Sequence, residues 1–137
     1  MPNEILPGIW IGYGNDINNE KFILQKNINC IISTVNINKN IEVIHIPIEN
    51  NNKLFIEYIY DIVNFIYKKY INYKNILIYC KNGTQLSPSI VVCFLVKYCD
   101  IDIENAIKFI KTKSNKSFID NCILKKDLNI FINNYKK

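Results

Sequence analysis

The sequence predicts an α/β fold, because short apolar runs typical of buried strands alternate with stretches that have the apolar spacing of helices. Ile28 to Val35 and Ile76 to Tyr79 are rich in β-prone residues, whereas Leu54 to Tyr73 repeats apolar side chains every three or four positions. A chain of 137 residues with 49% hydrophobic content is large enough for one domain with its own core. We therefore expect residues 1–137 to form a single domain.

Turn and capping residues divide the first half of the chain into elements. The Ile9–Tyr13 run lies between Pro7-Gly8 and Gly14-Asn15 and predicts a short strand, which we expect at a sheet edge. The elements predicted next are a helix from Asn18-Asn19-Glu20 to Lys26, a buried strand at 28–35, a polar turn at 36–40, a strand at 42–48 that ends at Pro47, an exposed loop at 49–52 and the helix at 54–73.

The most informative stretch runs from Ile76 through Cys80 and Gly83 into an apolar helix. The strand-like residues stop at Cys80, Gly83 allows a tight turn, and Pro88 suits the first turn of a helix. Backbone N–H groups of such a loop, together with the helix N-terminus, form a cradle for an anion beside a thiol. The pattern predicts the architecture of a phosphate site.

Helices are predicted for the rest of the chain. The apolar helix runs from Ser87 to Tyr98, the next helix follows Asp102 as its N-cap, and the last extends from about Phe118 to Tyr135.

Composition excludes several classes of function. The net charge is +5 and the 17 basic residues are all lysine, scattered among acidic residues, so nothing supports nucleic-acid binding. No run approaches the roughly 20 apolar residues of a membrane span, and the N-terminus lacks the apolar core of a signal peptide. The frequent Ile, Asn, Lys and Tyr are typical of AT-rich genomes, such as those of some large DNA viruses and protozoa.

The cysteines indicate a reducing compartment. Five cysteines form an odd set without a Cys-x-x-Cys pair and lie mostly within apolar runs, which predicts buried free thiols; they are Cys30, Cys80, Cys93, Cys99 and Cys122. The only histidine is His45, so a zinc site has no suitable ligand set. We expect an intracellular, cytoplasmic protein without metal or cofactor.

Several segments in order resemble the dual-specificity phosphatases, which belong to the cysteine-dependent protein tyrosine phosphatases. Glu4 to Gly12 resembles the opening strand of that family, Ile28 to Asn36 its second strand, His45 to Asn50 the entry to its acid loop, and Glu104 to Ile110 the helix that follows the active-site helix. The resemblance implies a compact protein tyrosine phosphatase fold, with a central, mostly parallel sheet of about five strands flanked by helices.

The active-site pattern of that family is His-Cys-x-x-Gly-x-x-Arg-Ser, and this chain has Tyr79-Cys80-Lys81-Asn82-Gly83-Thr84-Gln85-Leu86-Ser87 in its place. The resemblance makes Cys80 the nucleophile position, residues 80–86 the phosphate loop, and Ser87 the hydroxyl that assists breakdown of the phosphocysteine. Three family residues differ. Tyr79 replaces the histidine that organises the loop, Leu86 replaces the arginine that binds two phosphate oxygens, and Asn50 aligns with the aspartic acid that protonates the leaving oxygen.

Each replacement weakens catalysis on physical grounds. Leucine offers no donor, whereas an arginine fork makes two charge-assisted hydrogen bonds worth ~1.5–3 kcal/mol each. Asparagine cannot donate a proton at neutral pH, and loss of a general acid costs ~10²–10⁴ in rate. Lys53 and Lys81 are poor geometric substitutes for arginine, and rescue by Glu49 is not favoured because neighbouring extended residues point in opposite directions. Without its histidine and arginine, Cys80 should have a pKa nearer that of a free thiol.

These replacements predict a pseudophosphatase that binds a protein partner as a scaffold or decoy, the partner being a phosphoprotein or a phosphatase substrate. Two alternatives remain: a weak phosphatase that uses Cys80 with Glu49 or a lysine, and a module that binds phosphate or phosphopeptides without turnover. The sequence gives no indication of oligomeric state.

Structural interpretations of the same residues also stand. Cys80 can be an inert buried thiol, Leu86 ordinary packing, Asn50 a solvated loop residue and His45 a non-catalytic strand residue. The lysines at 108, 111, 113 and 116 can be a solvated surface or can contact an acidic partner.

Overall fold

The computed structural model describes residues 1–49, 53–81, 85–118 and 124–135. Its centre is a five-stranded sheet with the strand order β1-β2-β5-β3-β4. The strands are β1 Asn3–Leu6, β2 Ile9–Tyr13, β3 Ile28–Ser33, β4 Glu42–His45 and β5 Asn75–Cys80. β1 pairs with β2 in antiparallel fashion, and the β2–β5, β3–β5 and β3–β4 pairs are parallel. The predicted mostly parallel sheet is confirmed.

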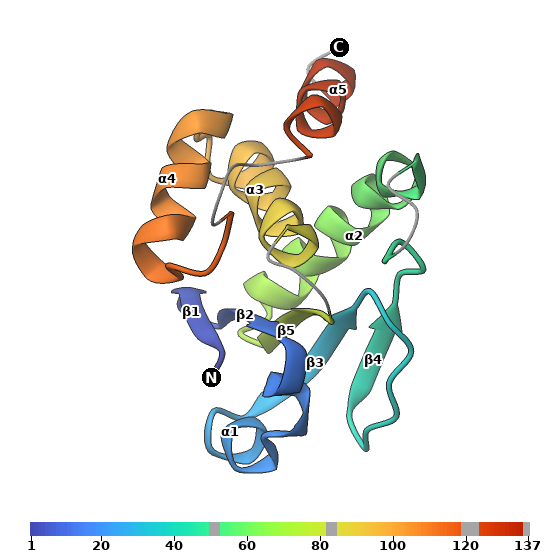
Figure 1. Ribbon diagram of the computed structural model, residues 1–137, viewed down its shortest axis with the longest axis vertical. Helices are drawn as coiled ribbons and strands as arrows, with labels where there is room; N and C mark the ends of the chain where they lie inside the picture. Colours follow the sequence, from blue (N-terminus) through green and yellow to red (C-terminus); the bar gives the residue numbers. More distant parts are fainter. Residues whose placement is uncertain (50–52, 82–84, 119–123, 136–137) are drawn as a thin grey trace.

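Helices cover both faces of this sheet (Figure 1). They are α1 Glu20–Gln25, α2 Lys53–Ile71, α3 Leu86–Tyr98, α4 Ile103–Lys113 and α5 Lys125–Tyr135, with a short 3-10 helix, η1, at Gly14–Asn18. α1 packs on one face, and α2 to α5 form the layer on the other. Up to α3, each helix follows one strand or a pair of strands, so the order is the mixture of strands and helices that the sequence predicts.

β5 supplies both faces of the core because alternate side chains of a strand point to opposite sides. Ile76, Ile78 and Cys80 lie in the large cluster that includes α2 and α3. Leu77 and Tyr79 lie in the smaller cluster with Phe22 and Ile23 of α1. Residues buried on both sides explain why this run has almost no polar alternation.

Two predicted positions are wrong. The Ile9–Tyr13 strand is not at the sheet edge, because Asn3–Leu6 folds back through Pro7-Gly8 and pairs with it as the edge strand, where Gly8 has a φ of 90°. The last helix begins at Lys125, not near Phe118, because Phe118 is fully buried with a left-handed φ of 55° that an α-helix cannot contain.

Several strand ends also differ by a few residues. β3 ends at Ser33, where the Ser33 hydroxyl donates to the Val35 carbonyl and ends the extended run. β4 ends at His45, two residues before Pro47, although Ile46 N still donates to the Ser33 carbonyl at 2.8 Å.

The α4 N-cap is confirmed as Asp102. Its carboxylate accepts hydrogen bonds from Asn105 N at 2.8 Å and from Asn105 Nδ2 at 3.0 Å. The amphipathic helix that follows buries Ile103, Ala106 and Ile110.

Replacing Asp102 with alanine should therefore lower the free energy of unfolding by about 1 kcal/mol, because one helix N–H loses its acceptor. Urea denaturation of Asp102→Ala and wild type measures this difference. Lys108→Ala, at an exposed position of the same helix, is the control and should change stability by less than about 0.5 kcal/mol. Equal losses in the two variants would contradict the capping role.

Candidate functional site

Cys80 lies at the point where the central strand ends and α3 begins. It is the last residue of β5 and is fully buried. Its Sγ is 3.1 Å from the Oγ of Ser87, in the first turn of α3. The strand and helix predicted around the loop are thus in place, whereas Asn82, Gly83 and Thr84 lie outside the described residues. The structure brings Cys80 and Ser87 together.

The surroundings of Cys80 disfavour a thiolate. Burial raises the pKa of the thiol above its ordinary value, and the Glu49 charge raises it further, while hydrogen bonds from Ser87 and the Leu86 backbone oppose the shift only in part. The thiol is therefore protonated at neutral pH. The sequence predicts a pKa close to that of a free thiol, and the structure moves it further in the same direction.

Leu86 is the first residue of α3 and is 6% exposed. Its side chain belongs to the same core cluster as Cys80. This burial supports the packing interpretation of Leu86. Gln85 is half-buried before the helix, and its side chain makes no N-cap hydrogen bond to α3.

Tyr79 faces the opposite side of the sheet from Cys80. Its ring is 2% exposed in the α1-side cluster, and its hydroxyl donates to the carbonyl oxygen of Gly14. Burial is the main reason that the pKa of Tyr79 is raised, so the hydroxyl keeps its proton and remains a donor. Tyr79 therefore ties β5 to the segment after β2.

Backbone hydrogen bonds fix the end of β5 to both neighbouring loops. Gly14 N donates to the Lys81 carbonyl at 3.2 Å, and Thr34 N donates to the Tyr79 carbonyl at 3.1 Å. The segments after β2, β3 and β5 consequently meet at one edge of the sheet.

Glu49 contributes a negative charge close to the thiol. The Thr34 hydroxyl donates to its Oε2, and its charge raises the pKa of both Cys80 and Tyr79. Sequence reasoning does not favour Glu49 as a site residue, whereas the structure holds its carboxylate near the nucleophile position. Asn50, the predicted replacement of the general acid, lies outside the described residues.

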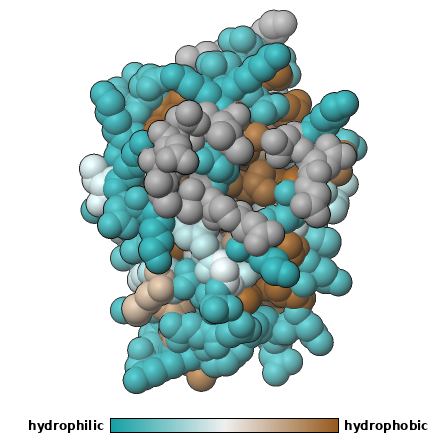
Figure 2. All heavy atoms as spheres, in the orientation of Figure 1, coloured by the Kyte–Doolittle hydropathy of each residue, from teal (hydrophilic) through white to brown (hydrophobic). Residues whose placement is uncertain are grey.

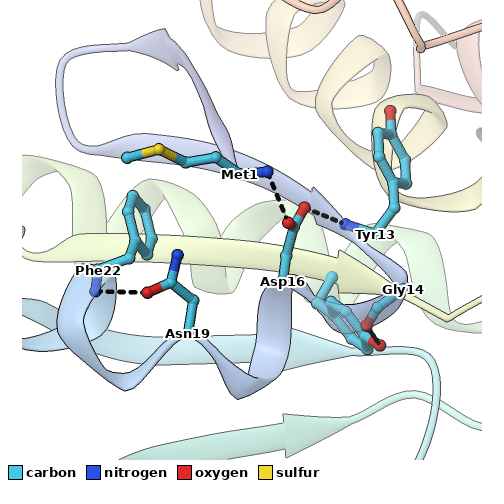
Figure 3. Close-up of polar contacts among 7 residues, drawn as sticks. Met1, Tyr13, Gly14, Asp16, Asn19 and Phe22 are labelled. Atoms are coloured by element: carbon cyan, nitrogen blue, oxygen red, sulfur yellow. Dashed lines mark hydrogen bonds and ion pairs between the residues drawn. The ribbon is translucent and has the colours of Figure 1, made fainter.

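Tyr13 is a residue near Cys80 that the sequence does not reveal. Its hydroxyl is hydrogen-bonded to Ser117, whose Oγ donates to Ser114 Oγ at 3.0 Å. Burial raises the pKa of Tyr13 to about 12, and Ser87 and Cys80 are among the groups that act on it. Figure 3 shows Tyr13 pointing away from Asp16, towards the helices. Ser117 is far away in sequence, so only a half-buried tyrosine hydroxyl in need of a partner could have indicated this contact.

Other predicted residues lie away from this centre or at the surface. His45 is exposed at the end of β4, and Lys81 is exposed after β5. The lysines at 108, 111, 113 and 116 are exposed, with the Lys113 Nζ 5.7 Å from the centre of the Phe109 ring. Cys30, Cys80 and Cys93 are buried and form no disulfide, as the sequence predicts, but Cys99 is exposed just after α3, and Cys122 lies outside the described residues.

Within the described ranges, no three His, Cys, Asp or Glu side chains are grouped so that they could hold a metal ion. None of the helices there has the length and apolar character required to cross a membrane.

The fold and the strand–loop–helix at Cys80 define a phosphatase-like α/β domain. Residues 9–134 match the dual specificity phosphatase catalytic domain family, and the chain belongs to that family. AMV078 of Amsacta moorei entomopoxvirus, whose name assigns it provisionally to the tyrosine-protein phosphatases, is 33% identical over 125 residues, with 82% of this chain and 74% of the relative covered.

Solved structures support the fold. Human DUSP28 superposes with a TM-score of 0.86 at 10% identity, covering 99% of this chain and 95% of the other. A leucine rich repeat and phosphatase domain containing protein from Entamoeba histolytica gives a TM-score of 0.84 at 21% identity, covering 98% and 92% of the two chains. At these identities the likeness establishes the fold alone.

The environment of Cys80 predicts slow alkylation. With its pKa raised, Cys80 should react with iodoacetamide more slowly than exposed Cys99 at pH 7.5, and its rate should still be rising above pH 9. Glu49→Gln should accelerate the reaction at fixed pH, because it removes a charge that raises the thiol pKa. Peptide mass spectrometry over time measures both rates. A Cys80 rate that levels off near pH 6 would indicate an activated thiolate and contradict this account.

Proposed function

We propose that this protein is a member of the dual-specificity phosphatase family without catalytic turnover, which acts by binding a protein partner as a scaffold or decoy. The observation that carries the proposal is the position of Leu86. Its buried apolar side chain begins α3, where the family resemblance has the arginine that binds two phosphate oxygens. The sequence contains no arginine that could supply the same fork from elsewhere.

The electrostatics around Cys80 support the same proposal. A phosphate-ester dianion is attracted by positive charge, but burial and the nearby Glu49 charge both keep the thiol protonated. A neutral thiol is a poor nucleophile, and a carboxylate beside it repels an anionic substrate. The protonated thiol and the Glu49 carboxylate therefore weaken both the binding of a phosphate ester and the attack of Cys80 on it.

The proposed partner is a protein, with phosphoproteins and phosphatase substrates as the candidate classes. The similarity to the entomopoxvirus relative supports a viral source as part of the proposal, in which case the partner is a host protein. An intracellular, cytoplasmic location is also proposed, supported by the buried Cys30 and Cys80, which form no disulfide.

A slow phosphatase is the second candidate, and Glu49 favours it. Its carboxylate is held by Thr34 near Cys80 and could, when protonated, donate to a leaving oxygen in place of Asn50. Under this alternative, Glu49→Gln would reduce turnover by ~10²–10⁴. Under the proposal above, the wild type has no turnover to lose.

The decisive measurement is hydrolysis of p-nitrophenyl phosphate by wild type and Cys80→Ser. We expect equal background rates, because no group in the wild type replaces the arginine fork. A wild-type rate that disappears in Cys80→Ser would overturn the proposal and favour the slow phosphatase.

The combined variant Leu86→Arg with Asn50→Asp tests whether the fold is still competent. It returns the fork and the general acid, so Cys80-dependent hydrolysis should rise by at least about tenfold over wild type. The same variant with Cys80→Ser is the control. Because position 86 is buried, a thermal melt must accompany the assay, and a folded but silent variant would contradict the assignment of these two positions.

A further inference from the structure

A cleft of about 400 Å³ lies beside the end of β5, on the α1 side of the sheet. Three segments meet around it: Gly14 to Asn18 after β2, Val35 to Ile37 after β3, and the end of β5. These are carboxyl ends of parallel strands, the edge at which open α/β sheets bind ligands. The volume is within the range of small-ligand and side-chain pockets.

The floor of the cleft is apolar. Buried Ile17 and Tyr79 and half-buried Val35 and Ile37 line it. The hydrogen bond from the Tyr79 hydroxyl to Gly14 fixes the tyrosine ring against one wall. The residue that replaces the family histidine thus shapes a surface on the opposite face of the sheet from Cys80.

The rim of the cleft suits a peptide backbone. Asn15, Asn18 and Asn36 are exposed around it, and each carboxamide offers a donor and an acceptor, as a peptide group does. The face of the molecule shown in Figure 2 is largely hydrophilic and has smaller apolar areas.

The charged residue at the cleft indicates which charge a ligand should carry. Lys81 is the charged residue among those that line it, and no lining residue is acidic. Asp16, the neighbouring acid in the sequence, does not line the cleft: its carboxylate accepts from Tyr13 N at 2.9 Å and pairs with the Met1 amino group at 2.9 Å (Figure 3), although its charge still acts on Tyr79. Lys81 is therefore the lining group that can pair with a negative group of a ligand.

From these features we infer that the cleft binds an extended acidic segment of the partner protein. An aliphatic side chain of that segment fills the apolar floor, its main chain pairs with the asparagine rim, and a neighbouring Asp or Glu meets Lys81. This inference rests on the proposed function, because it names where the partner binds and what chemistry the partner offers.

A second, larger surface pocket provides a matched control. It has a volume of about 720 Å³ and lies at the amino end of β5, with Tyr70, Ile71, Tyr73 and Lys74 in its lining. Glu4 also lines it, so its charges are mixed. Ile71 and Lys74 there correspond in chemistry to Ile37 and Lys81 in the cleft.

The experiment is selection of random 12-residue peptides displayed on phage against the folded wild-type chain. Recovered sequences should share an aliphatic residue next to Asp or Glu. The affinity of the best synthetic peptide, measured by fluorescence polarisation, should fall at least about tenfold in Ile37→Asp with Lys81→Glu, and change less than about twofold in Ile71→Asp with Lys74→Glu. Thermal melts verify that both variants are folded.

A second cleft variant keeps Ile37, so its loss of binding cannot come from misfolding caused by a change at that position. Asn36→Ala with Lys81→Glu should weaken the same peptide about tenfold, and 0.5 M salt should reduce wild-type binding. Failure to enrich any peptide, enrichment of basic peptides, or peptides bound equally well by the cleft and control variants would overturn the inference. Cys80-dependent hydrolysis would overturn the proposed function but would say nothing about peptide binding in the cleft. Failure of the proposed function and failure of the cleft inference are therefore distinguishable.

Discussion

β5 lies between β2 and β3 in the sheet and between helical layers on its two faces, and the other elements are arranged around this strand. Parallel partners on both sides satisfy its backbone, so its side chains can be apolar throughout. A fully buried strand cannot shift by one residue without exchanging its two faces. The strand register therefore fixes which side of the sheet receives Cys80 and which receives Tyr79.

The phosphatase-like frame and the phosphatase chemistry depend on different groups. The frame depends on burial along β5 and α3 and on backbone hydrogen bonds to the neighbouring loops, all of which this sequence retains. The chemistry depends on a fork of donors, a proton donor and a stabilised thiolate. Leu86 begins α3 and packs in the core cluster, so an apolar residue without a donor at this position keeps the packing intact.

Much of the fold could be predicted from the sequence because its strongest signals are local. The Asp102 cap, the long apolar face of α2 and the strand before Cys80 each depend on residues within a few positions of one another. The edge position of β1 could not be predicted in the same way, because Asn3–Leu6 is short and its pairing partner decides its place. Phe118 was assigned to a helix from its neighbours, whereas burial among distant residues holds it in a left-handed turn.

In the candidate site, too, local sequence patterns predict some residues and long-range contacts bring in others. Cys80, Leu86 and Ser87 belong to one contiguous pattern, and in the structure the Cys80 thiol lies beside the Ser87 hydroxyl while Leu86 begins α3. Tyr13 reaches the site from the end of β2 and Glu49 from the segment after β4, and their contacts with Ser117 and Thr34 depend on how distant parts of the chain pack together. Strand alternation does not fix the direction of the Glu49 side chain, because β4 ends at His45 and the chain beyond it is irregular.

The two sides of the β5 carboxyl end are bordered by different groups. On the α3 side, Glu49 and burial make Cys80 unfavourable for negative charge; on the α1 side, Lys81 borders a cleft whose lining has no acid. Tyr79 takes part on both sides, since its neutral phenol brings no positive charge near the thiol and its ring, fixed by the hydrogen bond to Gly14, forms one wall of the cleft. Because neighbouring residues of one strand face opposite sides of the sheet, β5 places Cys80 in the α3-side core and Tyr79 at the α1-side cleft.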